Sequence, residues 1–368
     1  MNWSFRIFRV AGTDVKVHVT FLLLLVYLGF NAYSGGGQAE LIATLAAVLG
    51  VFACILLHEF GHITMARRFG VLTPDVILLP IGGVARLQRM PDEPRQELLI
   101  ALAGPAVTLA IAAGLLTYLR LTGDHTSAFS FAVDAATLPG VLFQINVFLL
   151  LFNLIPAFPM DGGRVLRSLL AMRIGLVRAT RAAVTIGQTL AFVMGIGGWF
   201  LTHEIMLPLI GFFVFLGAGA ELAAVETRSA GAGMRVGDMM MTHFRTIPLH
   251  ARLDEATRML LEGDQREFPA VDNNGKIEGV LSRENLIKGL TERGPLSTVE
   301  EAMSANLPQL DPGEGFEDAL ARIKQSGAPA LPVVDRTGAL IGLLSLDNIA
   351  ELIQVRNAIR KDDGRRTR

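Results

Sequence analysis

The sequence predicts a polytopic α-helical membrane protein followed by a soluble α/β domain. Three observations carry this prediction: 51% of the 368 residues are apolar, the mean hydropathy is +0.45, and the long apolar stretches stop near Val225. A soluble domain does not need so much apolar surface to build its core. The formal net charge of −1 gives no reason to expect nucleic acid as a partner, and the apolar stretches indicate the lipid bilayer instead.

Six apolar stretches are long enough, or nearly so, to cross a hydrocarbon core of about 30 Å at about 1.5 Å per helical residue. We therefore expect about six transmembrane helices. The N-terminal segment, the loop after the second stretch and residues 164–181 are basic, which indicates that they face the cytoplasm. The N-terminus and the C-terminal domain are then cytoplasmic in a multi-pass protein of the cell membrane. The stretches run approximately over residues 19–33, 41–66, 98–119, 138–155, 183–201 and 205–225.

The loop between the second and third stretches contains two short strand-like runs, from Leu78 to Leu87, around a turn at Gly82 and Gly83. This pattern predicts a β-hairpin associated with the membrane. A plain surface hairpin is one interpretation. The other is a sheet edge near the active site that holds an extended substrate by strand addition.

The character of the sequence changes after the last apolar stretch. Residues 1–228 form the predicted membrane domain, and the small residues at 229–234 predict a linker. Residues 235–356 contain charged and apolar residues in the mixture that is usual for a soluble domain. The basic tail, residues 357–368, is predicted to be disordered.

An internal repeat organises the soluble domain. Phe268–Asp272 aligns with Leu331–Asp335 at an offset of 63 residues, and the segments that begin at Gly279 and Gly342 align at the same offset. Each copy has the pattern of helix, strand, turn, strand and helix. Two copies of one unit are expected to pack as a pair. Their boundaries are predicted at 235–291 and 298–356.

His58-Glu59-Phe60-Gly61-His62 places two imidazoles at i and i+4 on one helical face, where they can share one tetrahedral ion. The pattern predicts a zinc site, at which Glu59 takes a proton from the attacking water and passes it to the leaving amine. A structural polar cluster is the alternative. It is disfavoured within an apolar stretch, because three unpaired polar side chains would be costly there.

A catalytic zinc ion needs a third protein ligand, and Asp161 is the best candidate. It follows a segment in which Pro156 and Pro159, together with two glycines after the aspartate, interrupt the fourth apolar stretch. Irregular backbone at that depth is tolerated where it is buried in protein or lines a watery cavity. Asn153, just before the break, is a candidate to stabilise the oxyanion, and a helix-packing hydrogen bond is its equal alternative.

With these two motifs the sequence resembles the site-2 protease family of intramembrane zinc metalloproteases. The resemblance covers roughly residues 1–225 and implies His58, His62 and Asp161 as ligands of one Zn²⁺ ion, with Glu59 and Asn153 as catalytic residues. It also implies the reaction: cleavage of a transmembrane segment of a single-span membrane protein, with release of its cytoplasmic part.

The repeated region resembles a pair of CBS domains. This resemblance implies that the region binds an adenine nucleotide, ATP or AMP, and associates into a homodimer. A dimerisation or stabilising module without a ligand is the alternative. Glu284 departs from the aspartate that is usual in that family. The nucleotide-binding positions that the resemblance implies are Gly279, Ser282, Glu284, Gly342, Ser345 and Asp347.

Two other functions fit parts of the sequence. A transporter regulated by CBS domains predicts polar residues along a path through the bilayer, whereas this chain concentrates them at two positions. A proteolytically inactive scaffold is disfavoured because Glu59 and the three predicted ligands are all present.

Overall fold

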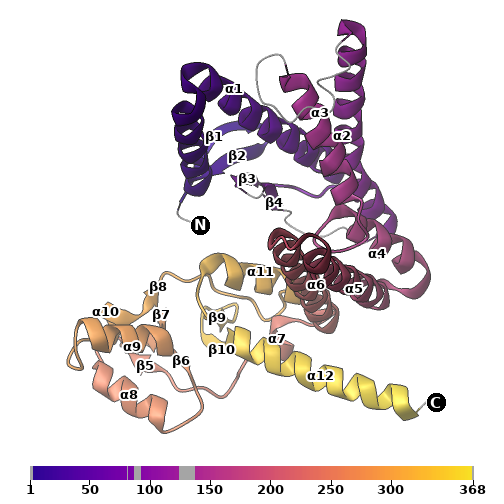
Figure 1. Ribbon diagram of the computed structural model, residues 1–368. Helices are drawn as coiled ribbons and strands as arrows, with labels where there is room; N and C mark the ends of the chain where they lie inside the picture. Colours follow the sequence, from indigo (N-terminus) through magenta and orange to yellow (C-terminus); the bar gives the residue numbers. More distant parts are fainter. Residues whose placement is uncertain (1–2, 81, 87–92, 124–136, 367–368) are drawn as a thin grey trace. The chain divides into compact units, whose positions relative to one another are not determined.

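The computed structural model describes residues 3–80, 82–86, 93–123 and 137–366. The chain divides into two compact units, Met1–Ala223 and Ala224–Arg368. In Figure 1 the first unit runs from indigo to dark red and the second from there to yellow. The boundary falls inside helix α6, Met206–Gly231, so one helix begins in the first unit and ends in the second.

The first unit begins with a four-stranded sheet in the order β1-β2-β3-β4. Strands β2 and β3 are parallel, since helix α1 separates them, and the other neighbours are antiparallel. Val17 of β2 and Leu78 of β3 pack against Phe21 and Phe52 of α1, so the sheet is anchored on that helix. The strands are Ser4–Val10 (β1), Thr13–His18 (β2), Asp75–Leu79 (β3) and Gly82–Arg86 (β4).

The two strands expected in the loop after α1 are β3 and β4, and their turn corrects the prediction. Leu79 pairs with Gly82, so Gly82 and Gly83 are the first residues of β4 and not the turn itself. Ile81 and Leu87 lie outside the described residues. The physical reason is local: Gly82 has φ +136°, and a methyl group at Gly83 would meet Ile55 and Glu59 of α1.

Helix α1, Val19–Arg68, turns back on itself at Gly37, whose φ of 73° and ψ of −153° are not helical. A methyl group on Gly29 would lie 3.1 Å from Leu41, and the rings of Phe21 and Phe52 are 4.3 Å apart. Contacts between residues so distant in sequence require two antiparallel arms. The arms correspond to the first two predicted apolar stretches.

Among the described residues, four further helices and most of α6 complete the first unit. In this described part, α1, α2, α5 and α6 are long and apolar enough to cross a membrane. Helix α3 is apolar but has 16 residues, about 24 Å at 1.5 Å per residue, and α4 lies between α3 and α5. The bounds are Pro94–Thr122 (α2), Leu138–Asn153 (α3), Asp161–Ile174 (α4) and Leu176–Thr202 (α5), followed by α6.

The second unit contains the two repeated copies, whose elements recur 63 residues apart. Strands β6 and β9 begin at Glu267 and Ala330, and β7 and β10 begin at Ile277 and Leu340. The first copy contains Ile247–Pro248 (β5), Leu253–Leu261 (α8), Glu267–Val271 (β6), Ile277–Ser282 (β7) and Arg283–Glu292 (α9). The second contains Val299–Ala302 (α10), Ser304–Ala305 (β8), Phe316–Ser326 (α11), Ala330–Val334 (β9), Leu340–Ser345 (β10) and Leu346–Arg366 (α12).

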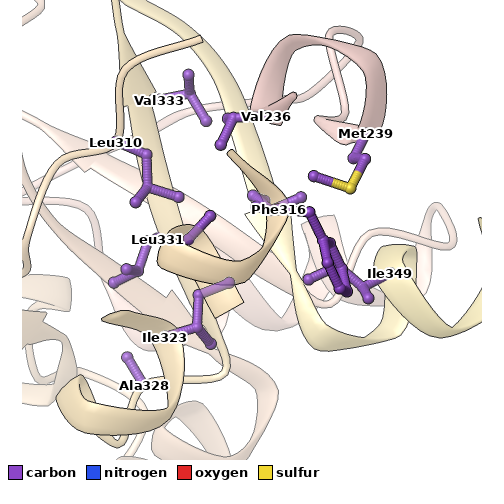
Figure 2. Packing of buried hydrophobic residues seen from close by; sticks show 11 residues of the cluster. Val236, Met239, Leu310, Phe316, Ile323, Ala328, Leu331, Val333 and Ile349 are labelled. Carbon is purple, nitrogen blue, oxygen red and sulfur yellow. The ribbon is translucent and has the colours of Figure 1, made fainter. Parts of the chain in front are cut away.

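The copies exchange their first segments. Strand β8, which begins the second copy, pairs with β7 of the first. Met241 in turn exchanges two backbone hydrogen bonds with Leu343 of β10, and helix α7, Val236–Met239, packs into the core of the second copy. Figure 2 shows Val236 and Met239 among the side chains of that core. Each core is therefore completed by residues of the other copy.

Both ends of the soluble region are more regular than predicted. Residues 229–231 are helical as the end of α6, and Gly231 is held against Phe316. These small residues therefore allow a close packing contact where the predicted linker begins. Helix α12 extends to Arg366, so the described part of the predicted tail, residues 357–366, is helical. No proline interrupts that segment, and its alanine, arginine and lysine residues favour helix.

Leu331→Ala is expected to destabilise the soluble unit by about 2–5 kcal/mol, because it leaves a cavity in a fully buried core. Leu296→Ala is the matched control, since that leucine is 68% exposed. Chemical unfolding of both variants, followed by circular dichroism, measures the difference. Equal losses of stability would contradict the described core.

Candidate metal centre

Two histidines of α1 and one aspartate of α4 meet inside the first unit. His58 and His62 are one helical turn apart, and their Nε2 atoms are separated by 3.1 Å. Oδ2 of Asp161 lies 3.2 Å from each of these nitrogens. The structure thus brings together the three side chains that the sequence predicts as metal ligands.

Hydrogen bonds fix the tautomer of both imidazoles. Nδ1 of His62 lies 2.7 Å from the carbonyl oxygen of Ile100, which can only accept, so this nitrogen carries the proton. Nδ1 of His58 lies 2.8 Å from Oγ1 of Thr108, whose own proton is donated to the carbonyl of Gly104. Both Nε2 atoms are therefore left with lone pairs that face each other and the carboxylate.

Three acceptor atoms facing one point repel each other unless a cation lies between them. The donor set of two imidazole nitrogens and a carboxylate oxygen suits zinc, with ligand bonds of about 2.0–2.2 Å. Tetrahedral bonds of that length separate neighbouring ligand atoms by about 3.3–3.6 Å, close to the spacing in this structure. Three protein ligands leave a fourth position for water or substrate, as a hydrolytic site requires.

Glycines let helices α1 and α2 approach closely enough to build this site. A methyl group on Gly104 would lie 2.2 Å from Nε2 of His62, and one on Gly61 would lie 2.6 Å from the carbonyl oxygen of Ala103. A side chain at Gly61 would require the backbone of α2 to move, and one at Gly104 would displace the His62 ring. Gly104 thus sets the space that His62 occupies.

Asp161 is placed by the interruption between α3 and α4. Residues 154–160 are not helical, and Asp161 is the first residue of α4, where its charge is favoured by the helix dipole. A methyl group on Gly162 would lie 2.3 Å from the carbonyl oxygen of Ile155, and one on Gly163 would lie 2.6 Å from the backbone of Ala157. The two glycines let the irregular segment fold tightly against the start of α4.

Glu59 and Asn153, the predicted catalytic residues, have different surroundings. Glu59 follows His58 on α1, and a methyl group on Gly83 would lie 2.9 Å from its Cγ. Strand β4 therefore lies beside Glu59, as expected from the interpretation that puts a sheet edge near the active site. Asn153 is the last residue of α3 and is half-buried, and its catalytic role stays a prediction.

In the soluble unit, packing accounts for the two predicted nucleotide-binding glycines. A methyl group on Gly279 would lie 2.5 Å from the carbonyl oxygen of Ser304, and one on Gly342 would lie 2.4 Å from the sulfur of Met240. Ser304 and Met240 belong to the exchanged segments. The glycines therefore let those segments cross the sheets, and their contact with a nucleotide stays a prediction.

Ser345 and Asp347, the other two predicted positions of the second copy, line a cavity of about 1160 Å³. The first copy contributes Arg266 and Glu267 to its wall. Arg266 donates to Oδ2 of Asp347 at 3.1 Å. Burial, and then the nearby charge of Asp347, raises the pKa of Glu267.

The predicted positions of the first copy lie elsewhere. Ser282 caps α9 by accepting from the backbone N–H of Asn285, and Glu284 is exposed. Neither residue, nor Gly279, is among those that line the cavity. The family resemblance implies positions in both copies, with Glu284 as the departure in the first, and of these positions Ser345 and Asp347 line the described cavity.

Comparison with known proteins identifies both units. Peptidase family M50 matches residues 46–139 and 126–196, and the CBS domain matches residues 236–292 and 299–355. Zinc metalloprotease MJ0392 of Methanocaldococcus jannaschii is 33% identical over 289 residues, which are 78% of this chain and 80% of the relative. Rip3 of Mycobacterium tuberculosis is 30% identical over 94% of this chain and 92% of its own. A solved structure of a site-2 protease from M. jannaschii is 34% identical, covers 60% of this chain and 95% of its own, and has a TM-score of 0.45.

Gly104→Ala is expected to lower the zinc content of the purified protein to well below one ion per chain, because the added methyl group occupies the space of the His62 ring. Gly114→Ala is the matched control, since a methyl group at Gly114 on the same helix meets no atom within 4 Å. Elemental analysis of both variants measures the effect. Full zinc content in Gly104→Ala would contradict this geometry.

Proposed function

Because the chain belongs to peptidase family M50, the site-2 protease family, and carries a C-terminal CBS domain pair, we propose that this zinc metalloprotease cleaves peptide bonds within the membrane. Its substrate is the transmembrane segment of a single-span, membrane-tethered protein. The observation that carries the proposal is the convergence of His58, His62 and Asp161 beside Glu59, with both histidines on a helix long and apolar enough to cross a membrane.

Each residue has a defined task in peptide hydrolysis. His58, His62 and Asp161 would hold a zinc ion, which would supply Lewis acidity and lower the pKa of a bound water to about 7. Glu59 accepts the proton of the attacking water and delivers it to the leaving amine. Asn153 is proposed to donate its amide to the developing oxyanion. Thr108 and the carbonyl of Ile100 hold the two imidazoles in the tautomer that binds metal.

Strand β4 supports a role in holding the substrate. It is the last strand of its sheet among the described residues, so one of its edges is open to a further strand. Gly83 of this strand lies against Glu59. A transmembrane helix must unwind locally before its peptide bonds can be attacked, and we propose that the unwound segment pairs with β4.

We propose that six segments cross the bilayer: the two arms of α1, then α2, α3, α5 and α6. Supporting this arrangement, α1, α2, α5 and α6 have the length and composition of spans, and α3 is shorter but apolar. The basic residues near the ends of the segments then place the N-terminus and the CBS pair in the cytoplasm. Strands β1 to β4 would lie at the cytoplasmic membrane surface.

For the CBS pair we propose one adenine nucleotide site, in the cavity lined by Ser345 and Asp347. Asp347 would accept from the ribose hydroxyls, and its present partner Arg266 would become available to the phosphate. Binding would modulate the protease. Association of two CBS pairs into a homodimer stays a prediction from the family resemblance.

The rival functions predict different outcomes. A transporter needs polar groups along a permeation path, whereas His58, His62 and Asp161 converge on one point and the chain matches a peptidase family. A scaffold that keeps the fold without turnover differs from a protease only in the rate of hydrolysis, so the substitution of Glu59 separates these two.

Glu59→Gln is expected to lower the rate of cleavage of a single-span substrate by about 100- to 10,000-fold, because the amide cannot act as a general base. The zinc content should stay at one ion per chain, since Glu59 is not a ligand. The reaction is carried out in liposomes, and cleavage of the substrate is followed by gel electrophoresis. Glu40→Gln, an exposed position on the same helix, should match the wild type. Equal activity of Glu59→Gln and wild type would exclude Glu59 as the base.

Asp347→Asn is expected to weaken AMP binding to the full-length protein about tenfold or more, because the ribose loses a charged acceptor. Glu284→Gln, the equivalent change in the first copy, should leave the dissociation constant unchanged. Isothermal titration calorimetry in detergent measures both. Equal weakening in both variants would favour two equivalent sites, and no binding to the wild type would favour a module without a nucleotide.

A further inference from the structure

A buried arginine, Arg167 of α4, joins three helices of the first unit. Its side chain is 2% exposed. Nε and Nη2 donate to Oε1 of Glu97 on α2, the former at 2.8 Å, and Nη1 donates to Oε1 of Glu221 on α6. The guanidinium also lies 4.9 Å from the centre of the Phe158 ring. None of these four residues takes part in the chemistry described above.

Three of these four residues are close in sequence to a group that forms the metal centre. Glu97 lies one helical turn before Ile100 on α2. The carbonyl oxygen of Ile100 accepts a hydrogen bond from Nδ1 of His62. Phe158 belongs to the irregular segment that ends at Asp161, and Arg167 is on the helix that Asp161 begins. The guanidinium therefore joins the helix that orients His62 to the segment that carries Asp161.

We propose that Arg167 is a positioning residue that sets the distance between Asp161 and the two histidines, and that Glu97 and Glu221 are the partners that fix it. The proposal rests on the metal centre of the proposed function. Ionic contacts to α2 and α6, on either side of the guanidinium, fix the rotation of α4 about its own axis. That rotation decides where the carboxylate of Asp161 points.

Arginine suits this task better than any other cation. Its planar guanidinium has five donors in a fixed geometry, so it can bind two carboxylates and pack on an aromatic ring at the same time. A lysine ammonium at position 167 keeps the charge but cannot hold two partners in one plane. A well-packed apolar side chain can stabilise a protein as much as a buried ion pair does, so a purely structural role would not require this arrangement.

Zinc affinity of the full-length protein in detergent, measured by competition with a chelating dye, tests the proposal. Arg167→Lys is expected to raise the dissociation constant for zinc about tenfold or more. Glu221→Gln should raise it by a smaller factor, because this variant keeps the hydrogen bonds between Arg167 and Glu97. Arg173→Lys, an exposed arginine on the same helix, should bind zinc like the wild type. In cobalt-substituted protein, the visible absorption of Arg167→Lys should differ from that of the wild type and of Arg173→Lys.

Thermal unfolding with excess chelator separates positioning from folding. Metal-free Arg167→Lys should unfold at a lower temperature than metal-free wild type, because a buried carboxylate loses its partner, but should stay folded at the temperature of the zinc titration. If it does not stay folded there, the comparison passes to Glu221→Gln, which retains the arginine. Unchanged zinc affinity and an unchanged cobalt spectrum in the folded variants would overturn the role of Arg167. Wild-type protein that binds no zinc would instead overturn the proposed function, and the role of Arg167 with it.

Discussion

The interaction on which the first unit depends is the mutual approach of three acceptor atoms inside an apolar environment. His58 and His62 present lone pairs because their other nitrogens are engaged by Thr108 and by the carbonyl of Ile100. Asp161 adds a carboxylate at 3.2 Å. A cation at the centre of such a cluster stabilises it. Binding energy of the metal is then also energy that holds α1, α2 and α4 together.

Much of this arrangement can be predicted from sequence, since it depends on local patterns. The helical spacing of His58 and His62 places them on one face, and the prolines before Asp161 end a helix where a ligand is needed. The apolar stretches predict the helices, including the two arms that meet at Gly37. The constant offset of 63 residues predicts two copies of one unit. The family matches agree: the two CBS domains follow the region that matches peptidase family M50.

Other features depend on which distant segments pack together, and short-range patterns do not contain that information. Nothing near Glu97 in the sequence indicates Arg167 as its partner, and the hairpin pattern leaves open whether Gly83 lies near the active site or on the surface. The roles of Gly279 and Gly342 follow the same rule. A glycine in a family motif suggests contact with a ligand, whereas here the neighbouring backbone and side chains of the other copy occupy the space. Tertiary packing decides between these two interpretations.

The exchange of segments between the two CBS copies has a consequence for how such a protein can change during evolution. The first copy takes strand β8 from the second, and the second takes α7 and Met241 from the start of the first. A deletion that removes one copy would therefore uncover an unfinished sheet in the survivor. A recombination event that adds or removes this module therefore preserves folded domains only when it transfers both CBS copies together.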